Sequence, residues 1–221
     1  MRNKHRTLLL DLDGTLADTA PDLAHALNTV RQEEGFELLP FETIRPSVSH
    51  GSMALIKIGF DPDISESHAE NLRQRLLDHY ANRLCVETRL FDGMHELLDQ
   101  CDQTGIAWGV VTNKPAYLTD PLMEQLELHE RAACIISGDT LEKRKPHPEP
   151  LLHACELAQG NPNTTIYIGD AERDIEAGNR AGMTTLVAAF GYLSGNDSPV
   201  DWGADGQVHH ARELMDWLAL N

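Results

Sequence analysis

Hydrophobic and polar positions divide the chain into two kinds of segment. Close to its start, a short apolar run from Thr7 to Leu10 stops abruptly at acidic residues, which is typical of a buried strand. From Leu16 to about Glu87 the apolar residues recur at helical spacing instead, as Leu72, Leu76, Tyr80 and Leu84 do. We predict helices throughout this region, with a first long helix from about Pro21 to Glu34, and no strand.

Beyond about Arg89, apolar runs and helical patterns alternate. The apolar runs predict strands at Ile106–Val111, Ala133–Ile136, Thr164–Ile168 and Thr184–Val187. The helical patterns predict helices at Gly93–Gln103, Ala116–Leu126, Pro150–Ala158, Ala171–Ala181 and, in the tail, Ala211–Leu220. Such alternation gives an α/β fold, a parallel sheet with helices on both faces.

The helical region interrupts this α/β pattern directly after the first strand. We therefore predict a core domain made of residues 1–15 and 88–221 and an inserted helical cap domain made of residues 16–87. The chain crosses between the two domains twice, so hinges are expected near Leu16–Asp18 and Glu87–Asp92.

Two acids, Asp11 and Asp13, follow the first strand. Ligands of open α/β sheets bind beyond the carboxyl ends of the strands, so these acids stand where chemistry occurs. Gly14 then allows a tight turn. Two carboxylates this close repel each other, and bound Mg²⁺, which prefers hard oxygen ligands, relieves the repulsion. Taken alone, the pattern also fits acids that cap a turn or a helix.

Two later segments supply neutral and basic groups. Thr112 and Asn113 end a predicted strand ahead of a helix, whose first N–H groups suit a phosphate. Lys143-Arg144-Lys145 is a basic cluster beside two prolines, which stiffen the loop so that one lysine can be held in a fixed position. Taken alone, the first segment also fits a helix cap and the second a solvated loop.

A second pair of acids, Asp170 and Asp174, follows the strand that ends at Ile168. Because they are four positions apart, a helix that begins there carries both on one face. Glu172 and Arg173 are expected to point outward as surface charges. Acids in a first helical turn are also favoured by the helix dipole. The ordered set of segments, each at the end of a strand, is much more specific than any one of them.

Composition and net charge exclude some classes of binding partner. The chain of 221 residues has a formal net charge of −17, which argues against nucleic acid and anionic membrane surfaces. Its 4 cysteines form no Cys-x-x-Cys pair and are expected to be free thiols in a reducing compartment. The first apolar run is too short for a signal peptide or a membrane span. We expect a cytoplasmic protein, a monomer or weak dimer, that acts on a small molecule.

The ordered set resembles the haloacid dehalogenase-like hydrolase superfamily over nearly the whole chain. The resemblance implies a Rossmann-like core, with the helical insert as a C1-type cap. It also implies that Asp11 is the nucleophile, which forms an aspartyl-phosphate, and that Asp13 is the acid and base. Thr112 and Asn113 would bind the phosphoryl group of a phosphate ester, and Lys145 would neutralise its charge and steady Asp11.

The resemblance implies a metal set as well. Asp11, Asp170 and the backbone carbonyl of Asp13 would hold Mg²⁺, and Asp174 would support the metal or the lysine. An acid at position 13 favours phosphoryl transfer, because the dehalogenases of the superfamily lack it. Two alternatives stay open: a phosphomutase of the β-phosphoglucomutase type, and a non-catalytic regulatory protein on the same fold.

Within the superfamily, the chain is most similar to phosphoglycolate phosphatase-like proteins. The cap sequence Val48–Gly51, together with Trp108–Pro115 and Trp202–Asp205, resembles the N-acetylmuramic acid 6-phosphate phosphatase branch. The implied substrate carries a carboxylate, as N-acetylmuramic acid 6-phosphate and 2-phosphoglycolate both do. The predicted cap contacts are Arg45, Ser49 and His50, and Arg45 is expected to meet the carboxylate, although a surface arginine and a capping serine fit equally well.

Overall fold

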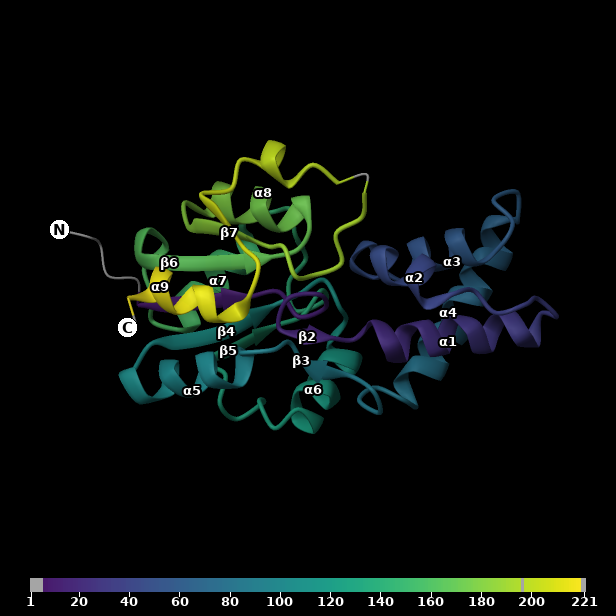
Figure 1. Ribbon diagram of the computed structural model, residues 1–221, viewed down its shortest axis with the longest axis horizontal. Coiled ribbons are helices and arrows are strands. Elements are labelled where there is room, and N and C mark those ends of the chain that lie inside the picture. The colour runs from purple at the N-terminus through teal and green to yellow at the C-terminus, as the bar shows by residue number, and fades with distance from the viewer. Residues whose placement is uncertain (1–5, 196, 220–221) are drawn as a thin grey trace.

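A computed structural model describes residues 6–195 and 197–219, which form two lobes joined by two crossings of the chain (Figure 1). The larger lobe holds a parallel sheet and both ends of the described part of the chain, and the smaller lobe consists of helices. The α/β fold with an inserted helical cap is confirmed. The exact division at residues 15/16 and 87/88 stays a prediction.

The sheet of the larger lobe has six strands in the order β5-β4-β1-β6-β7-β8, and every neighbouring pair is parallel. The strands are β1 (Thr7–Leu10), β4 (Ala107–Val111), β5 (Cys134–Ile136), β6 (Thr165–Gly169), β7 (Thr184–Ala188) and β8 (Gly206–Val208). The chain moves outward from β1 to β5 on one side and then returns to β6 on the other side. This reversal at β1 is the point in such sheets where ligands bind.

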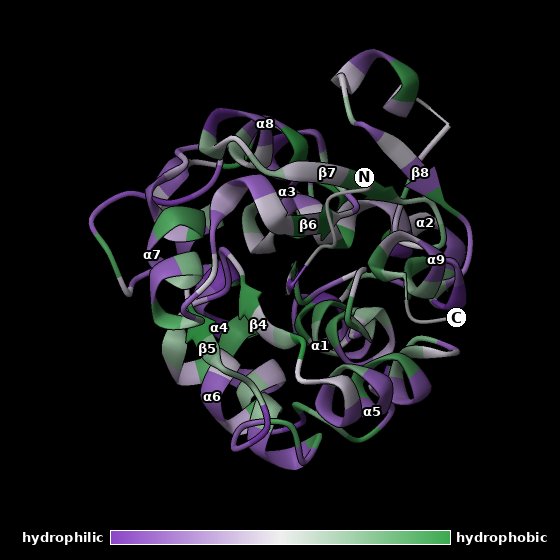
Figure 2. Cartoon of the chain, turned by 90° about the vertical axis from the view of Figure 1, so that its left-hand side faces the viewer, coloured by the Kyte–Doolittle hydropathy of each residue, from purple (hydrophilic) through white to green (hydrophobic). Residues whose placement is uncertain are grey.

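Helices cover both faces of the sheet. The elements of the larger lobe are α5 (Met94–Thr104), α6 (Ala116–Gln125), α7 (Glu149–Leu157), α8 (Glu172–Ala181) and α9 (Leu214–Leu218), with short 3₁₀ helices at Pro162–Thr164, Pro199–Trp202 and Ala211–Glu213. Leu8 and Leu10 pack with α5, α6 and α9, whereas Leu9 packs with α7 and α8 on the opposite face. Figure 2 shows β4 and β5 mainly in the hydrophobic colour and the outer surfaces of α5 and α8 mainly in the hydrophilic one.

The cap is a bundle with its own hydrophobic core. It contains α1 (Ala20–Glu33), α2 (Phe41–Ile44), the 3₁₀ helix η1 (Arg45–His50), α3 (Ser52–Gly59) and α4 (Glu66–Ala81). Leu27, Leu72, Leu76 and Tyr80 are fully buried in this core. Leu118 of α6 and Tyr192 of the larger lobe also pack in it, so the cap and the core share apolar contacts.

Three short strands were missed by the sequence pattern. β2 (Ala17–Asp18) lies within the region predicted to lack strands and pairs antiparallel with β3 (Arg89–Leu90), just beyond that region. This ribbon lies where the chain crosses between the lobes. At the sheet edge, β8 pairs with β7. Segments of two or three residues are too short to show any periodicity, and backbone pairing with distant residues is what holds them.

Two expectations from composition can be compared with the structure. All four cysteines are free thiols, as predicted, and Cys101, Cys134 and Cys155 are buried. Among the described residues, no helix has both the length and the apolar character that a membrane crossing needs.

Candidate active site

The predicted site residues converge at the carboxyl end of the central strands. Leu10 of β1 lies opposite Val110 of β4 and Ile168 of β6, so these three strands end side by side. Asp11, Thr112 and Asp170 follow these strands closely and stand at one edge of the sheet. This arrangement, predicted from strand ends alone, is what the parallel register produces.

Three buried carboxylates lie together at this edge. Asp11, Asp170 and Asp174 each offer an oxygen within 4.8 Å of the others. Burial and the neighbouring Asp11 raise the pKa of Asp170 to about 7, and burial raises the pKa of Asp11 to about 6 although Lys145 opposes it. Asp170 Oδ1 is buried without any hydrogen-bond partner among the described residues. A divalent cation would satisfy that oxygen and offset the repulsion, so the residues fit Mg²⁺.

Lys145 is the cation that the structure supplies to this cluster. Its Nζ lies 2.8 Å from Asp11 Oδ1 and 2.8 Å from Asp174 Oδ1, and it donates to Val111 O and Tyr167 Oη. Burial by itself would raise the pKa of Asp174, but the charges of Lys145 and Arg173 outweigh it and lower that pKa below 3.8. Lys145 is only 2% exposed, and its ammonium group lies directly against Asp11, the candidate nucleophile.

Asp11 itself is partly restrained. Its Oδ1 accepts from the backbone N–H of Leu12 at 2.8 Å as well as from Lys145, and no described residue donates to Oδ2. One oxygen is therefore held while the other remains for a metal ion or an incoming phosphorus.

Thr112 and Asn113 have different roles at the end of β4. The Thr112 hydroxyl accepts from the N–H of Lys114 at 3.2 Å and lines the cavity described below. Asn113 exchanges hydrogen bonds with the backbone of Lys145, at 3.0 and 3.1 Å. Asn113 therefore positions the loop that carries the lysine, besides lining the cavity.

Asp13 points toward the cap rather than into the carboxylate cluster. Its Oδ1 accepts from Thr19 Oγ1 at 2.6 Å and from Lys114 Nζ at 2.9 Å. Lys114 in turn donates to the hydroxyl of Tyr80 in α4, at 2.9 Å. This side chain lies outside the carboxylate cluster and lines the cavity described below, a position from which an acid and base can reach a leaving group.

Lys114 and Tyr80 were not predicted as site residues. Lys114 directly follows Thr112 and Asn113, which were predicted to bind substrate. The sequence therefore shows a second lysine near the site, but we assigned it no role. Tyr80 was predicted only as an apolar helix position, and periodicity says nothing of where its hydroxyl lies.

Two predictions about the segment after β6 were wrong. Asp170 does not share a helix with Asp174, because α8 begins at Glu172; Asp174 reaches back from the first helical turn and accepts from the N–H of Ala171 at 3.1 Å. Arg173 does not point to solvent: its Nη2 donates to the carbonyl of Ser49 in the cap, at 2.5 Å. Charge attraction to the acid cluster draws this side chain inward.

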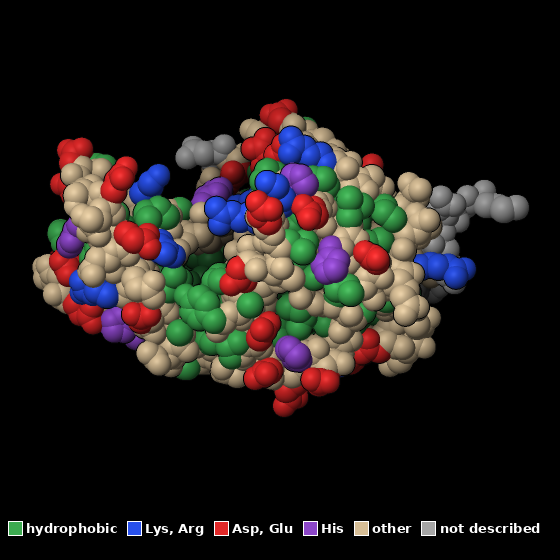
Figure 3. Space-filling view, turned by 180° about the vertical axis from the view of Figure 1, so that it is seen from behind, with side chains coloured by type: hydrophobic (Ala, Val, Ile, Leu, Met, Phe, Trp, Pro, Cys, Tyr) green, Lys and Arg blue, Asp and Glu red, His purple; other side chains and the backbone are tan. Residues whose placement is uncertain are grey.

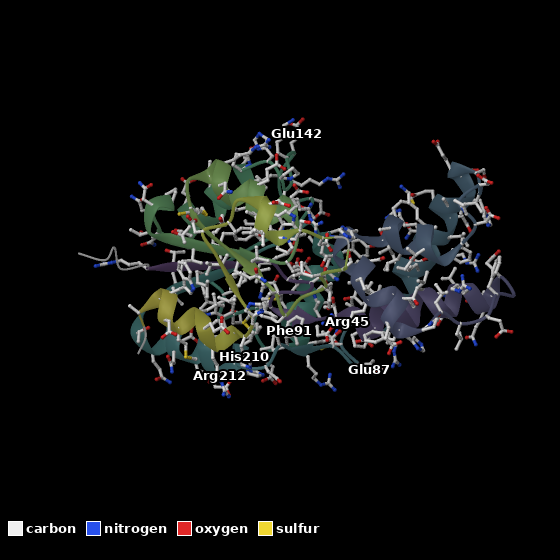
Figure 4. All side chains as sticks on the ribbon, turned by 45° about the horizontal axis from the view of Figure 1, so that its top comes forward. Arg45, Glu87, Phe91, Glu142, His210 and Arg212 are labelled. Carbon is white, nitrogen blue, oxygen red and sulfur yellow. The ribbon has the colours of Figure 1, made fainter. Side chains whose placement is uncertain are left out.

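The three predicted cap contacts lie on η1 and have different environments. Ser49 Oγ donates to Asp170 Oδ2 at 2.6 Å. His50 is exposed and lines the cavity. Arg45 does not line it: the guanidinium donates to Gly191 O at 3.0 Å and lies over the ring of Tyr192, at the junction of the two lobes (Figure 4).

The site opens into a cavity of about 770 Å³ between the lobes. Polar lining residues include Asp11, Asp13, Thr112, Lys114 and Arg173, and apolar lining residues include Leu23, Leu55, Leu77 and Leu118. Arg73 of α4 and Arg144 also face it. Figure 3 shows the hollow from outside, with Lys and Arg side chains gathered along its mouth.

Comparisons with known proteins agree with this geometry. Residues 8–188 match the family described as haloacid dehalogenase-like hydrolase. The chain is 39% identical to an N-acetylmuramic acid 6-phosphate phosphatase of Pseudomonas aeruginosa, over 98% of this chain and 96% of that one. It is 40% identical to a phosphoglycolate phosphatase of Xanthomonas campestris pv. campestris, over 96% and 95% of the two chains.

A solved structure from Haemophilus somnus, titled as a predicted phosphoglycolate phosphatase, has the same fold. It superposes with a TM-score of 0.86, covers 98% of this chain and 99% of its own, and is 22% identical. The family match, the two relatives and the intact set of acids and lysine lead to one conclusion: the chain belongs to the haloacid dehalogenase-like hydrolase family, among its phosphatases.

Proposed function

We propose that this protein is a Mg²⁺-dependent phosphomonoesterase that hydrolyses a small carboxylate-bearing phosphate ester through an aspartyl-phosphate on Asp11. The observation that carries the proposal is the position of Lys145 Nζ, 2.8 Å from both Asp11 and Asp174, beside a third buried carboxylate. Such a group of charges is costly to bury unless it holds a cation and receives an anion.

The chain's own residues account for both chemical steps. The Asp11 carboxylate attacks phosphorus, and the bond from phosphorus to the substrate oxygen breaks as Asp13 gives that oxygen a proton. Asp13, now a carboxylate, takes a proton from water, whose oxygen attacks the phosphorus of the aspartyl-phosphate and restores Asp11. Thr112 hydrogen-bonds the phosphoryl oxygens, and the positive charge of Lys145 offsets their negative charge.

The metal has a defined place in this scheme. Asp11, Asp170 and the backbone carbonyl of Asp13 would hold Mg²⁺, with Asp174 supporting the site. When bound, Mg²⁺ supplies positive charge that reduces the repulsion between the anionic nucleophile and the anionic phosphoryl group.

Between the two candidate substrates, the size of the cavity favours N-acetylmuramic acid 6-phosphate over 2-phosphoglycolate. A cavity of about 770 Å³ lies within the range of sites for drug-sized ligands and is large for a two-carbon acid. The leucine side chains that line the cavity can pack against the apolar parts of a sugar derivative. Arg144 lines the cavity, and no described residue forms an ion pair with it, so we place the substrate carboxylate there rather than at Arg45.

The direct test is release of inorganic phosphate from both esters, with and without Mg²⁺. We expect Mg²⁺-dependent release, with a higher kcat/KM for the sugar phosphate. If Mg²⁺ elicits no phosphate from a broad panel of phosphate esters, the proposal is wrong. An isomerised product in place of free phosphate would instead indicate a phosphomutase.

Asp11→Asn tests the covalent step. An amide cannot attack phosphorus, so kcat should fall at least about 1,000-fold, as it does when a nucleophile is removed from other hydrolases. The variant should fold, because it removes one charge from a crowded acid cluster, and its thermal unfolding in EDTA is the check. Retained turnover would refute the assignment of the nucleophile.

A further inference from the structure

Ser49 is the cap residue in direct contact with the acid cluster. Its Oγ donates to Asp170 Oδ2 at 2.6 Å, and this bond is buried. Its carbonyl accepts from Arg173 Nη2 at 2.5 Å. A single residue of η1 is therefore held at two points by the segment that follows β6. The hydroxyl that the sequence suggested for substrate is already engaged with a carboxylate.

The contact fixes the orientation of Asp170. Oδ2 receives two hydrogen bonds, from Ser49 Oγ and, at 2.9 Å, from the backbone N–H of Tyr192. Oδ1 is buried and receives none from the described residues. Donors that hold one oxygen of a ligating carboxylate set the direction of the other, and this raises metal affinity. Ser49 and Tyr192 thus hold Oδ2 and leave Oδ1 without a donor, and Asp170 offers a carboxylate oxygen within 4.8 Å of oxygens of Asp11 and Asp174.

The two donors belong to different lobes. The N–H of Tyr192 comes from the core loop that follows β7, and this loop packs directly on Asp170: a Cβ added to Gly191 would lie 2.5 Å from Asp170 Cβ. Ser49 comes from the cap. If the cap moved away from the core, the Tyr192 bond, which lies within the core, would stay and the Ser49 bond would be lost.

Further contacts dock η1 on the same core loop. Arg45, at the start of η1, donates to Gly191 O at 3.0 Å, and its guanidinium carbon lies 4.7 Å from the centre of the Tyr192 ring. Figure 4 shows Arg45 at the junction of the lobes. The start of this short helix therefore rests on the loop that packs on Asp170, and Ser49 near its end contacts Asp170 directly.

We propose that Ser49 is a positioning residue, through which docking of the cap raises the affinity of Asp170 for the divalent cation. The inference rests on the proposed Mg²⁺ site. With the cap docked, the Ser49 hydroxyl holds Asp170 for the ion; with the cap away, the carboxylate has one donor fewer and binds more weakly. Coupling between two binding events is reciprocal, so the ion in turn favours the docked cap.

The test compares Ser49→Ala and Ser49→Thr with Ser47→Ala. Ser47 lies on the same helix and makes no side-chain hydrogen bond with a described residue, so it is a matched control. The Kd for Mg²⁺ is measured by titration calorimetry on the whole protein without substrate. Ser49→Ala should raise it about 10-fold, the lower end of the effect of removing such a partner. Ser49→Thr, which keeps a hydroxyl, and Ser47→Ala should stay close to wild type.

Hydrogen exchange supplies the second readout. Mg²⁺ should slow exchange of the η1 amides in the wild-type protein and do so much less in Ser49→Ala. Melting in EDTA shows whether each variant is folded. If Ser49→Ala does not fold, the Kd for Mg²⁺ is compared between Ser49→Thr and Ser49→Val, whose side chains have the same shape. An unchanged or lower Kd for Mg²⁺ in the variants without a hydroxyl overturns the role of Ser49 but leaves the proposed function intact. A wild-type protein that binds no Mg²⁺ contradicts the proposed function itself.

Discussion

Asp170 and Asp11 are neutral over a range of pH in which ordinary carboxyl groups are charged. Burial raises the pKa of Asp170 from 3.8 to about 7 and that of Asp11 from 3.8 to about 6. Both groups keep a proton in the folded protein that the unfolded chain has already released. Their contribution to the free energy of unfolding is therefore largest near pH 4 and is lost as pH rises toward 7.

Asp170→Asn should expose this effect in the metal-free protein. The amide stays neutral at every pH and can still accept from Ser49 and Tyr192. In EDTA, we expect the Tm of the variant to exceed that of wild type by a margin that grows as pH rises from about 4 to about 7. In excess Mg²⁺ the order should reverse, since only the wild type binds the ion well. A margin that is constant with pH would show that Asp170 titrates normally.

Arg144 carries a prediction about substrate binding. If its guanidinium meets the substrate carboxylate in both ground state and transition state, Arg144→Ala should raise KM about 10-fold, with little change in kcat. Lys143→Ala is the matched control, because Lys143 is an exposed neighbour that does not line the cavity. A normal KM in Arg144→Ala, together with a raised KM in Arg45→Ala, would return the carboxylate to the position that the sequence suggested.

At the scale of helices and strands, the bounds predicted from the sequence agree best with the structure for the longer elements. The strand predicted at Thr184–Val187 is Thr184–Ala188, and the helix predicted at Ala116–Leu126 is Ala116–Gln125, because each has enough residues to show its period. The tail predicted as one helix, Ala211–Leu220, is a 3₁₀ turn followed by α9, and position 220 lies outside the described residues. Leu84 continues the spacing of α4 but lies beyond its end at Ala81.

The site could be predicted as far as strand ends and motifs define it. Asp11, Lys145 and Asp170 lie together because parallel strands bring their carboxyl ends to one edge. The bonds of Ser49 and Tyr80 to the core could not be predicted, since they depend on how two separately folded lobes meet. No local pattern encodes that packing.

Asp22, at the start of α1, binds the segment Glu87–Asp92, through which the chain returns from the cap to the core; we call this segment the second linker. Its buried carboxylate accepts from the N–H groups of Glu87 and Thr88 and from the Thr88 hydroxyl, at 2.8 to 3.2 Å. Asp22→Ala leaves these donors unpaired and should lower the free energy of unfolding by about 2–3 kcal/mol. Denaturant unfolding checks this, and Asp92→Ala, an exposed acid of the same linker, should have little effect. If both variants unfold alike, Asp22 does not hold the linker.

At the scale of the whole molecule, the charge of the surface and the charge of the site have opposite signs. The chain carries a formal net charge of −17, yet Lys114, Arg73, Arg144 and Arg173 line the cavity that receives an anionic substrate. Distant acids repel the substrate during its approach, whereas the local cations attract it once it is inside. Salt separates the two effects, because screening acts beyond about 30 Å at 0.01 M and beyond about 8 Å at 0.15 M.

We therefore expect kcat/KM to rise, or at least not to fall, when ionic strength increases from about 0.01 to about 0.15 M, since the distant repulsion is screened first. Arg144→Ala should make the rise steeper, because it removes a local attraction that opposes the repulsion. Initial rates at substrate concentrations well below KM, in a chloride salt, measure this directly. A steep fall of kcat/KM with salt would mean that the cations at the mouth reach farther than the acids of the surface, and that the protein attracts its anionic substrate from a distance despite its net charge.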